Sequence, residues 1–173
     1  QVRALYRALE GAIAGLASTE ARDEWSVPAG LSFATLARAE YFTSFPQWLT
    51  GAAHLACDRG VLESIATDPD PALAARESMA PADVALVPAV CYHVYERLAG
   101  RTIASPTLVT AQGTCWRHEG DRLAPLERGW AFTMREIVCL GSREDVEAFR
   151  ERGIWRAAAL AIRHHPIVNS SFG

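Results

Sequence analysis

The stretch from Thr107 to Gly141, TLVTAQGTCWRHEGDRLAPLERGWAFTMREIVCLG, decides the fold that this sequence predicts. Two β-strands are expected in it, over 108–119 and 130–140, because both runs contain β-branched and aromatic residues between turn-forming segments. The polar segment that joins them contains Gly120, Asp121, Pro125 and Gly129, which are typical of a loop. We therefore expect two strands that pair with each other.

The faces of these two strands carry an unusual set of side chains. Side chains alternate along a strand, so Arg117 and Glu119 share one face. Phe132, Met134 and Glu136 share a face of the second strand for the same reason. If the strands pair antiparallel, one sheet surface gathers an arginine, two carboxylates and an aromatic ring. His118 then points to the other face, where we expect a structural role.

Such a surface suits the activation of a carboxylate by a nucleotide. An arginine fork at Arg117 can hold an α-phosphate and stabilise the charge that develops on it. Glu119 can accept a hydrogen bond from an exocyclic amine, Phe132 can stack on a purine, and Arg128 can reach the outer phosphates. Taken alone, Arg117 and Glu119 fit a solvated salt bridge better. Their spacing to Arg128, Phe132 and Glu136 favours the nucleotide site.

The motif CWRHEG at 115–120, followed by Arg128 and by F-x-M-R-E at 132–136, resembles motif 2 of seryl-type class II aminoacyl-tRNA synthetases. It is more similar to their small relatives, the amino acid:[carrier protein] ligases. The segments SVPAGLSFATLARAEYFTSFPQW at 26–48 and DVALVPAVCYHVYERLAG at 83–100 are similar to the preceding segments of the ligases, in the same order. The resemblance covers the chain from about Trp25 to Gly153.

This resemblance implies an α+β fold, in which a mainly antiparallel sheet with flanking helices forms a class II synthetase-like catalytic core. We expect residues 1–173 to form a single domain that is incomplete at its C-terminal end and lacks the motif 3 region. The implied activity is ATP-dependent activation of a small amino acid to its aminoacyl-adenylate, followed by transfer to the phosphopantetheine thiol of an acyl or peptidyl carrier protein. Arg117 would be catalytic, and Arg117, Glu119, Arg128 and Phe132 would bind ATP. Without motif 3, we expect this chain alone to be inactive.

The resemblance also implies two metal ions and a homodimer. Cys91 and Glu136 would be two of three protein ligands to Zn²⁺, with the third ligand beyond residue 173 and an open position for the amino group of the substrate. The spacing of Cys91 and Glu136 alone does not indicate a zinc site. Mg²⁺ would accompany ATP. Pro28 lies where class II enzymes have a motif 1 proline at their dimer contact, and a plain turn proline explains it equally well.

Two alternatives stay open. A seryl-type synthetase that charges tRNA would need a basic or coiled-coil extension, and residues 1–19 form neither. The net charge of −3 gives no reason to expect tRNA or another nucleic acid as a partner. The other alternative is a non-catalytic paralogue that binds a nucleotide or a carrier protein but lacks motif 3.

Composition excludes several other classes of protein. The chain of 173 residues suits one domain, and all 17 of its Lys and Arg residues are Arg, which excludes a lysine nucleophile or a P-loop lysine within it. Its four cysteines form no C-x-x-C pair, which favours reduced thiols. No run approaches 18 apolar residues, so we expect a cytoplasmic protein without a membrane partner.

Hydrophobic spacing and turn residues predict the remaining elements. Ser32 is a candidate helix cap, and the S-x-x-D pattern of Ser142 and Asp145 predicts a capping box. Ser44, Phe45 and Pro46 either border the substrate pocket or form a tight turn. The expected elements are helices over 2–17, 33–39, 71–79, 91–98 and 143–163, strands over 25–27, 52–57 and 83–87, and a loop or sheet edge over 41–48.

Overall fold

A computed structural model describes residues 2–18, 21, 23–56, 58–120, 123–124 and 128–170, with the backbone alone at 2, 18 and 161–170. The chain divides into two compact units. Unit 1 contains residues 1–27, 93–113 and 134–173, and unit 2 contains residues 28–92 and 114–133. In chain order, the elements are α1 (Val2–Ser18), β1 (Asp23–Ser26), β2 (Gly30–Ser32), α2 (Phe33–Arg38), α3 (Tyr41–Ser44), the 3₁₀ helix η1 (Pro46–Trp48), β3 (Thr50–Leu55), α4 (Arg59–Thr67), α5 (Pro71–Glu77), β4 (Met79–Leu86), α6 (Cys91–Leu98), β5 (Thr107–Trp116), β6 (Ala131–Leu140) and α7 (Arg143–Ser170).

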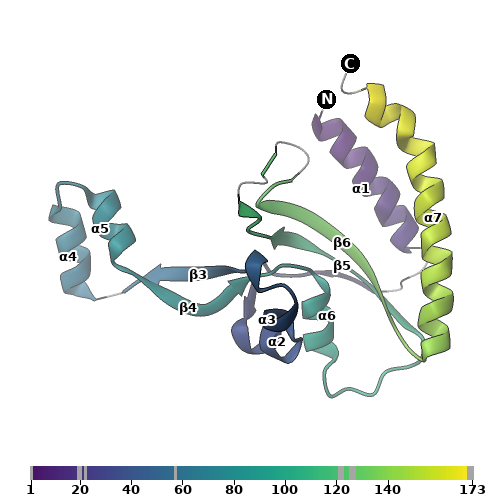
Figure 1. Cartoon of the computed structure of the whole chain (residues 1–173), viewed down its shortest axis with the longest axis horizontal. Coiled ribbons are helices and arrows are strands. Elements are labelled where there is room, and N and C mark those ends of the chain that lie inside the picture. Colours follow the sequence, from purple (N-terminus) through teal and green to yellow (C-terminus); the bar gives the residue numbers. More distant parts are fainter. Residues whose placement is uncertain are drawn as a thin grey trace. The chain divides into compact units, whose positions relative to one another are not determined.

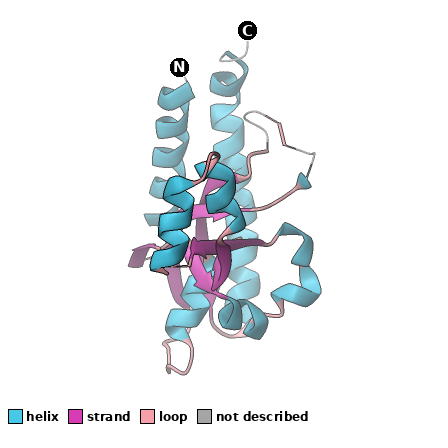
Figure 2. Cartoon of the chain, turned by 90° about the vertical axis from the view of Figure 1, so that its left-hand side faces the viewer, coloured by secondary structure: helices cyan, strands magenta, loops and turns pink. Residues whose placement is uncertain are grey.

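The first sheet has the strand order β1-β5-β6. β1 pairs with β5 in parallel, with Asp23 opposite Val109 and Ser26 opposite Gln112. In unit 1, the helices α1 and α7 contact each other and lie side by side in both views (Figure 1, Figure 2). Val109 and Ala111 of β5 are fully buried, which gives this unit an apolar core.

β5 and β6 form the predicted strand pair. The Thr110 hydroxyl donates to the carbonyl oxygen of Glu136 at 3.0 Å, and the Arg117 N–H donates to the carbonyl oxygen of Trp130 at 2.9 Å. The start of β5 therefore lies against the end of β6, so the two strands run antiparallel. β5 ends at Trp116. The sequence predicted a strand as far as Glu119, but 117–119 do not belong to it. The predicted single domain stays a prediction.

The second sheet lies in unit 2 and has the strand order β2-β4-β3, with both pairings antiparallel. Leu86 of β4 lies opposite Gly30 of β2 on one side and Thr50 of β3 on the other. The helices α4 and α5 pack together between the end of β3 and the start of β4 (Figure 1). Leu31, Leu36 and Ala85 supply part of the buried core of this unit.

Local capping chemistry confirms several predicted helices. The Ser32 hydroxyl accepts from the Thr35 N–H at 3.1 Å and caps α2. At the start of α7, the Ser142 N–H donates to Asp145 Oδ2 at 3.0 Å while the Asp145 N–H donates to Ser142 Oγ at 3.1 Å, which is the expected capping box. The helices expected over 2–17 and 91–98 correspond to α1 and α6.

Other predicted elements were wrong in type or extent. Residues 41–48 form α3 and η1 rather than a loop or edge, because Pro46 begins a helical turn, where its missing N–H costs nothing. β3 is not a buried strand, since one of its faces is exposed, as an antiparallel sheet allows, and Cys57 lies outside the described residues. α4 was missed. α7 continues past Pro166, since a proline removes one backbone donor and can kink a helix without ending it.

Within the described ranges, no helix combines the length and apolarity that crossing a bilayer requires.

Candidate functional site

Arg117 lies directly after β5 in unit 2 and is held from three sides. Its Nε donates to the carbonyl oxygen of Pro88 at 3.0 Å. Its guanidinium carbon lies 5.3 Å from the ring centroid of Trp48 and 5.3 Å from that of Phe132, within the range of a cation–π interaction. The described part of the chain offers its terminal nitrogens no hydrogen-bond partner. Arg117 therefore presents the four N–H donors of its two terminal nitrogens from a fixed plane.

Trp48 continues this contact into an aromatic row. Its ring stacks on Phe45 with centroids 5.1 Å apart and planes at 2°. Phe45 in turn contacts Tyr41, with ring centroids 6.5 Å apart. Sequence analysis missed Trp48. The available signal was the density of aromatic residues in 41–48 together with Pro46, which fits the first position of a helical turn.

Glu119 and Arg128 form an ion pair, in which Arg128 Nη1 donates to the Glu119 carboxylate. Two backbone hydrogen bonds join Ala124 and Arg128, at 3.0 and 2.9 Å. The salt bridge weighed for Arg117 and Glu119 is absent from the described contacts, because Glu119 lies beyond the end of β5 and pairs with Arg128 instead. Two of the four side chains assigned to ATP thus lie together.

A cleft of about 430 Å³ opens beside this pair, within the size range of small-molecule sites. His118 lines it, and its ring lies edge-on to Trp130 with centroids 5.6 Å apart. The expectation that His118 points away from Glu119 is therefore wrong, because 117–119 leave the strand and lose strict alternation. Its structural role stays a prediction. The cleft is lined by Gln47, Trp48, His118, Glu119, Gly120 and Arg128.

Tyr41 lies at the far end of the aromatic row. Its side chain is 2% exposed, and its hydroxyl has no hydrogen-bond partner among the described residues. Burial raises the pKa of the Tyr41 phenol, the neighbouring Tyr92 raises it further, and the charge of Arg117 opposes both effects. Ser44, Phe45 and Pro46, weighed as pocket residues, lie outside the lining of the cleft.

Cys91 and Glu136, the predicted zinc ligands, belong to different units, and their joint ligation stays a prediction. Cys91 begins α6 and is partly buried, and Glu136 lies on β6. A thiolate and a carboxylate are both suitable Zn²⁺ donors. Among the described residues, no three His, Cys, Asp or Glu side chains form a group that could hold a metal ion.

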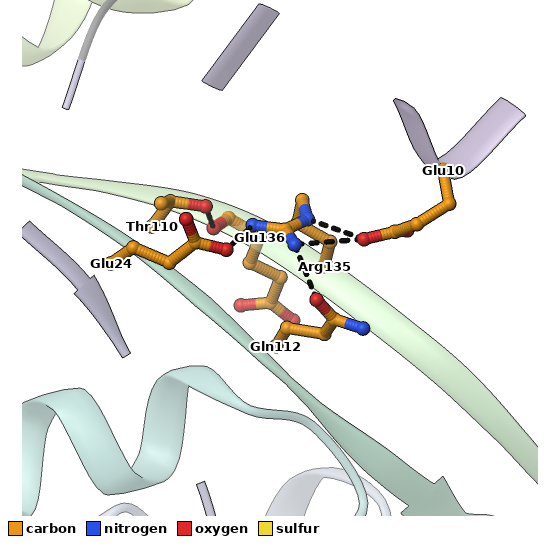
Figure 3. Close-up of polar contacts among 6 residues, drawn as sticks. All are labelled: Glu10, Glu24, Thr110, Gln112, Arg135 and Glu136. Carbon is orange, nitrogen blue, oxygen red and sulfur yellow. Dashed lines mark hydrogen bonds and ion pairs between the residues drawn. The ribbon is translucent and has the colours of Figure 1, made fainter. Parts of the chain in front are cut away.

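Next to Glu136 in sequence, Arg135 is the buried centre of an ionic cluster in unit 1 (Figure 3). It is 6% exposed, donates twice to Glu10 at 3.0 and 2.7 Å and once to Glu24 at 2.7 Å, and also contacts Gln112. Burial alone would lower the pKa of Arg135, but the hydrogen bonds and charges of the two glutamates raise it. Arg135 therefore ties α1 and β1 to β6. Sequence analysis assigned it no role.

Known proteins resemble this chain in sequence. No protein-family model matches the chain. Two curated proteins of Bradyrhizobium diazoefficiens do match. Amino acid--[acyl-carrier-protein] ligase 2 is 34% identical over 163 residues, and ligase 1 is 33% identical over 166 residues. Each match covers 91% of this chain. The chain is a homologue of these ligases. It spans about half of their length, 48% of ligase 2 and 49% of ligase 1.

Solved structures confirm the fold of this ligase homologue. The M. kandleri SerRS, in its complex with A. aeolicus tRNASec, matches 90% of the chain with a TM-score of 0.72 and 18% identity. PylSc, a pyrrolysyl tRNA synthetase of Desulfitobacterium hafniense, matches 90% of it with a TM-score of 0.53 and 17% identity. The matches cover 33% and 44% of those two chains. The ligase homologue thus has the α+β fold of a class II synthetase catalytic core, as the sequence predicted.

Proposed function

We propose that this ligase homologue belongs to an ATP-dependent enzyme that activates a small amino acid and transfers it to a carrier protein. The homology to amino acid--[acyl-carrier-protein] ligases over 91% of the chain carries the proposal. The site supports it, because Arg117 stands over Phe132 while Glu119 and Arg128 line a neighbouring cleft. An arginine, an aromatic face and a carboxylate are the groups that an adenine nucleotide requires.

In the first step, a carboxylate oxygen of the amino acid attacks the α-phosphorus of ATP. A new oxygen–phosphorus bond forms, the bond to the leaving pyrophosphate breaks, and negative charge builds on the α-phosphate oxygens. The N–H groups on the two terminal nitrogens of Arg117 would bind this charge. Because Pro88 and two aromatic rings already fix the guanidinium, little reorganisation is needed when the charge develops.

The nucleotide would be held by three further side chains. The ring of Phe132 can stack on the purine, Glu119 can accept from its exocyclic amine, and Arg128 can reach the outer phosphates. Since Glu119 and Arg128 are paired with each other, both would exchange this partner for ATP. Mg²⁺ would accompany ATP and neutralise part of its charge.

The amino group of the substrate would be recognised separately from the nucleotide. We propose that Cys91 and Glu136 supply two protein ligands to Zn²⁺, with the third beyond residue 173. A zinc ion with an open position selects a neutral amine, and so favours α-amino acids over plain carboxylic acids. We further propose that the enzyme acts as a homodimer, as its resemblance to class II enzymes implies.

In the second step, the phosphopantetheine thiol of the carrier protein attacks the carbonyl carbon of the adenylate. A thioester bond forms, the bond to AMP breaks, and the thiol proton passes to water, with no covalent protein intermediate. This route needs no protein nucleophile. It therefore needs no Ser-His or Cys-His pair within the chain.

Amino-acid-dependent pyrophosphate exchange by the full-length protein tests the proposal. We expect exchange with one or a few small amino acids, and an exchange rate at least about tenfold lower in Arg128→Ala, because the outer phosphates lose a charged partner. Arg59→Ala is the matched control, since the Arg59 side chain is 93% exposed and pairs with Glu63 alone among the described residues.

The competing function predicts a different result. A wild-type protein that binds ATP but shows no exchange with any amino acid would contradict the ligase and favour a non-catalytic binding module. Equal exchange rates in Arg128→Ala and Arg59→Ala would reject only the role of Arg128.

A further inference from the structure

Tyr41 carries a buried hydroxyl that the fold itself does not explain. The side chain is 2% exposed, and its oxygen has no hydrogen-bond partner among the described residues. Tyr41 is also the largest of the fully buried side chains. A buried polar group without a partner destabilises a protein, so its presence calls for an explanation, and a ligand that supplies the partner is one. A phenylalanine would fill this position without that cost.

The surroundings of Tyr41 connect it to Arg117 within unit 2. Tyr41 contacts Phe45, Phe45 stacks on Trp48, and the Arg117 guanidinium lies over Trp48. The charge of Arg117 acts on the Tyr41 phenol directly. An unpaired hydroxyl and a guanidinium with unpaired terminal N–H groups thus belong to one aromatic row.

The Tyr41 phenol keeps its proton at neutral pH and can therefore donate a hydrogen bond. Burial raises its pKa above the ordinary value of a tyrosine, Tyr92 adds to that shift, and Arg117 offsets part of it. A protonated phenol and a guanidinium are both donors, and each suits an oxygen anion. Both groups are therefore prepared for the same kind of ligand atom.

The cleft indicates which part of the substrate supplies that oxygen. Trp48, Glu119 and Arg128 line the cleft assigned to the nucleotide, and Tyr41 does not. The oxygen near Tyr41 should therefore belong to the other reactant. We infer that the Tyr41 hydroxyl donates a hydrogen bond to the carboxylate of the amino acid substrate. This role rests on the proposed ligase function and adds a recognition residue to it.

Tyr41→Phe in the full-length protein tests the inference, because it removes one oxygen atom from the side chain. We expect kcat/KM for the amino acid in pyrophosphate exchange to fall about 10- to 100-fold, the effect of losing a hydrogen bond to a charged group. KM for ATP should stay unchanged. The melting temperature should stay equal or rise, since the hydroxyl stabilises nothing in the free protein. Tyr6→Phe, at a tyrosine that is 47% exposed on α1, is the matched control.

Three results would overturn the inference. One is an active wild type with the same kcat/KM for the amino acid in Tyr41→Phe. Another is a variant whose activity falls only in step with a lower melting temperature, which would make Tyr41 structural. The third is a rise in KM for ATP alone, which would assign the hydroxyl to the nucleotide. An inactive wild type would instead remove the proposed function, and this inference with it.

Discussion

Arg117 combines a fixed position with free donors. Its Nε is bonded to Pro88, and the rings of Trp48 and Phe132 hold its plane. These contacts use the inner edge and the faces of the guanidinium and leave the outer edge to a ligand. A lysine cannot reproduce this arrangement, because its ammonium is a single point of charge without a plane to stack.

Arg117→Lys should therefore retain charge but lose activity. We expect kcat for pyrophosphate exchange by the full-length protein to fall about 100-fold, the effect of removing one donor to a developing anion. Steady-state kinetics would measure it, with Arg59→Lys, at the 93% exposed arginine, as the control. A kcat within twofold of the wild type would exclude Arg117 from the chemical step.

The motif residues could be predicted from sequence, and their partners could not. Arg117, Glu119, Arg128 and Phe132 lie within 16 residues of each other in sequence, in a recognisable order. The partners of the site come from elsewhere. Trp48 and Tyr41 stand on helical turns of three and four residues, which are too short to show a period.

At the scale of elements, Arg135 of β6 binds Glu10 of α1 and Glu24 of β1 (Figure 3). Three segments that are far apart in sequence thus meet at one cation. Sequence patterns predicted the helix and both strands, because periodicity and caps are local. They did not predict this contact, because the pairing of distant charges depends on the packed structure.

Replacing Arg135 should destabilise unit 1. Because Arg135 is 6% exposed, Arg135→Gln leaves Glu10 and Glu24 without their cation, and we expect the free energy of unfolding to fall by about 3 kcal/mol. This is the lower end of the range for a broken buried pair, since Glu24 is 62% exposed and can be solvated. Urea unfolding followed by circular dichroism would measure the change.

Arg143→Gln supplies the comparison for that measurement. Arg143 and Glu147 form an exposed pair one helical turn apart, worth about 0.5 kcal/mol or less. If the two variants lost the same free energy of unfolding, the contacts of Arg135 would stabilise the protein no more than an exposed ion pair does.

At the scale of the whole molecule, the class II fold could be predicted because motif residues and alternating strands coincide in the stretch from Thr107 to Gly141. The division into two units could not, because β5 and β6 each run from one unit into the other and give no break in the sequence pattern. The chain spans about half of its curated relatives, so the metal site has to be tested in the full-length protein.

That protein should bind about one Zn²⁺ per chain, and Cys91→Ser should lower both the zinc content and the exchange rate. Elemental analysis beside the exchange assay, with and without a chelator, would measure both. Cys139→Ser is the control, because burial and the nearby Asp145 raise the pKa of the Cys139 thiol, against the effect of Arg152, and make it a poor metal ligand. Full zinc content in Cys91→Ser would rule out Cys91 as a ligand.

The ion pair of Glu119 and Arg128 has a consequence for how fast a nucleotide associates. Opposite charges held in contact produce a field that decays quickly with distance, so an approaching triphosphate feels little attraction from this pair until it enters the cleft. The rate of ATP binding should then depend on the step after encounter, in which Glu119 and Arg128 exchange their mutual contact for contacts with ATP. Added salt, which screens long-range steering, should consequently change the association rate of ATP less than it would at a cleft with an unpaired cation.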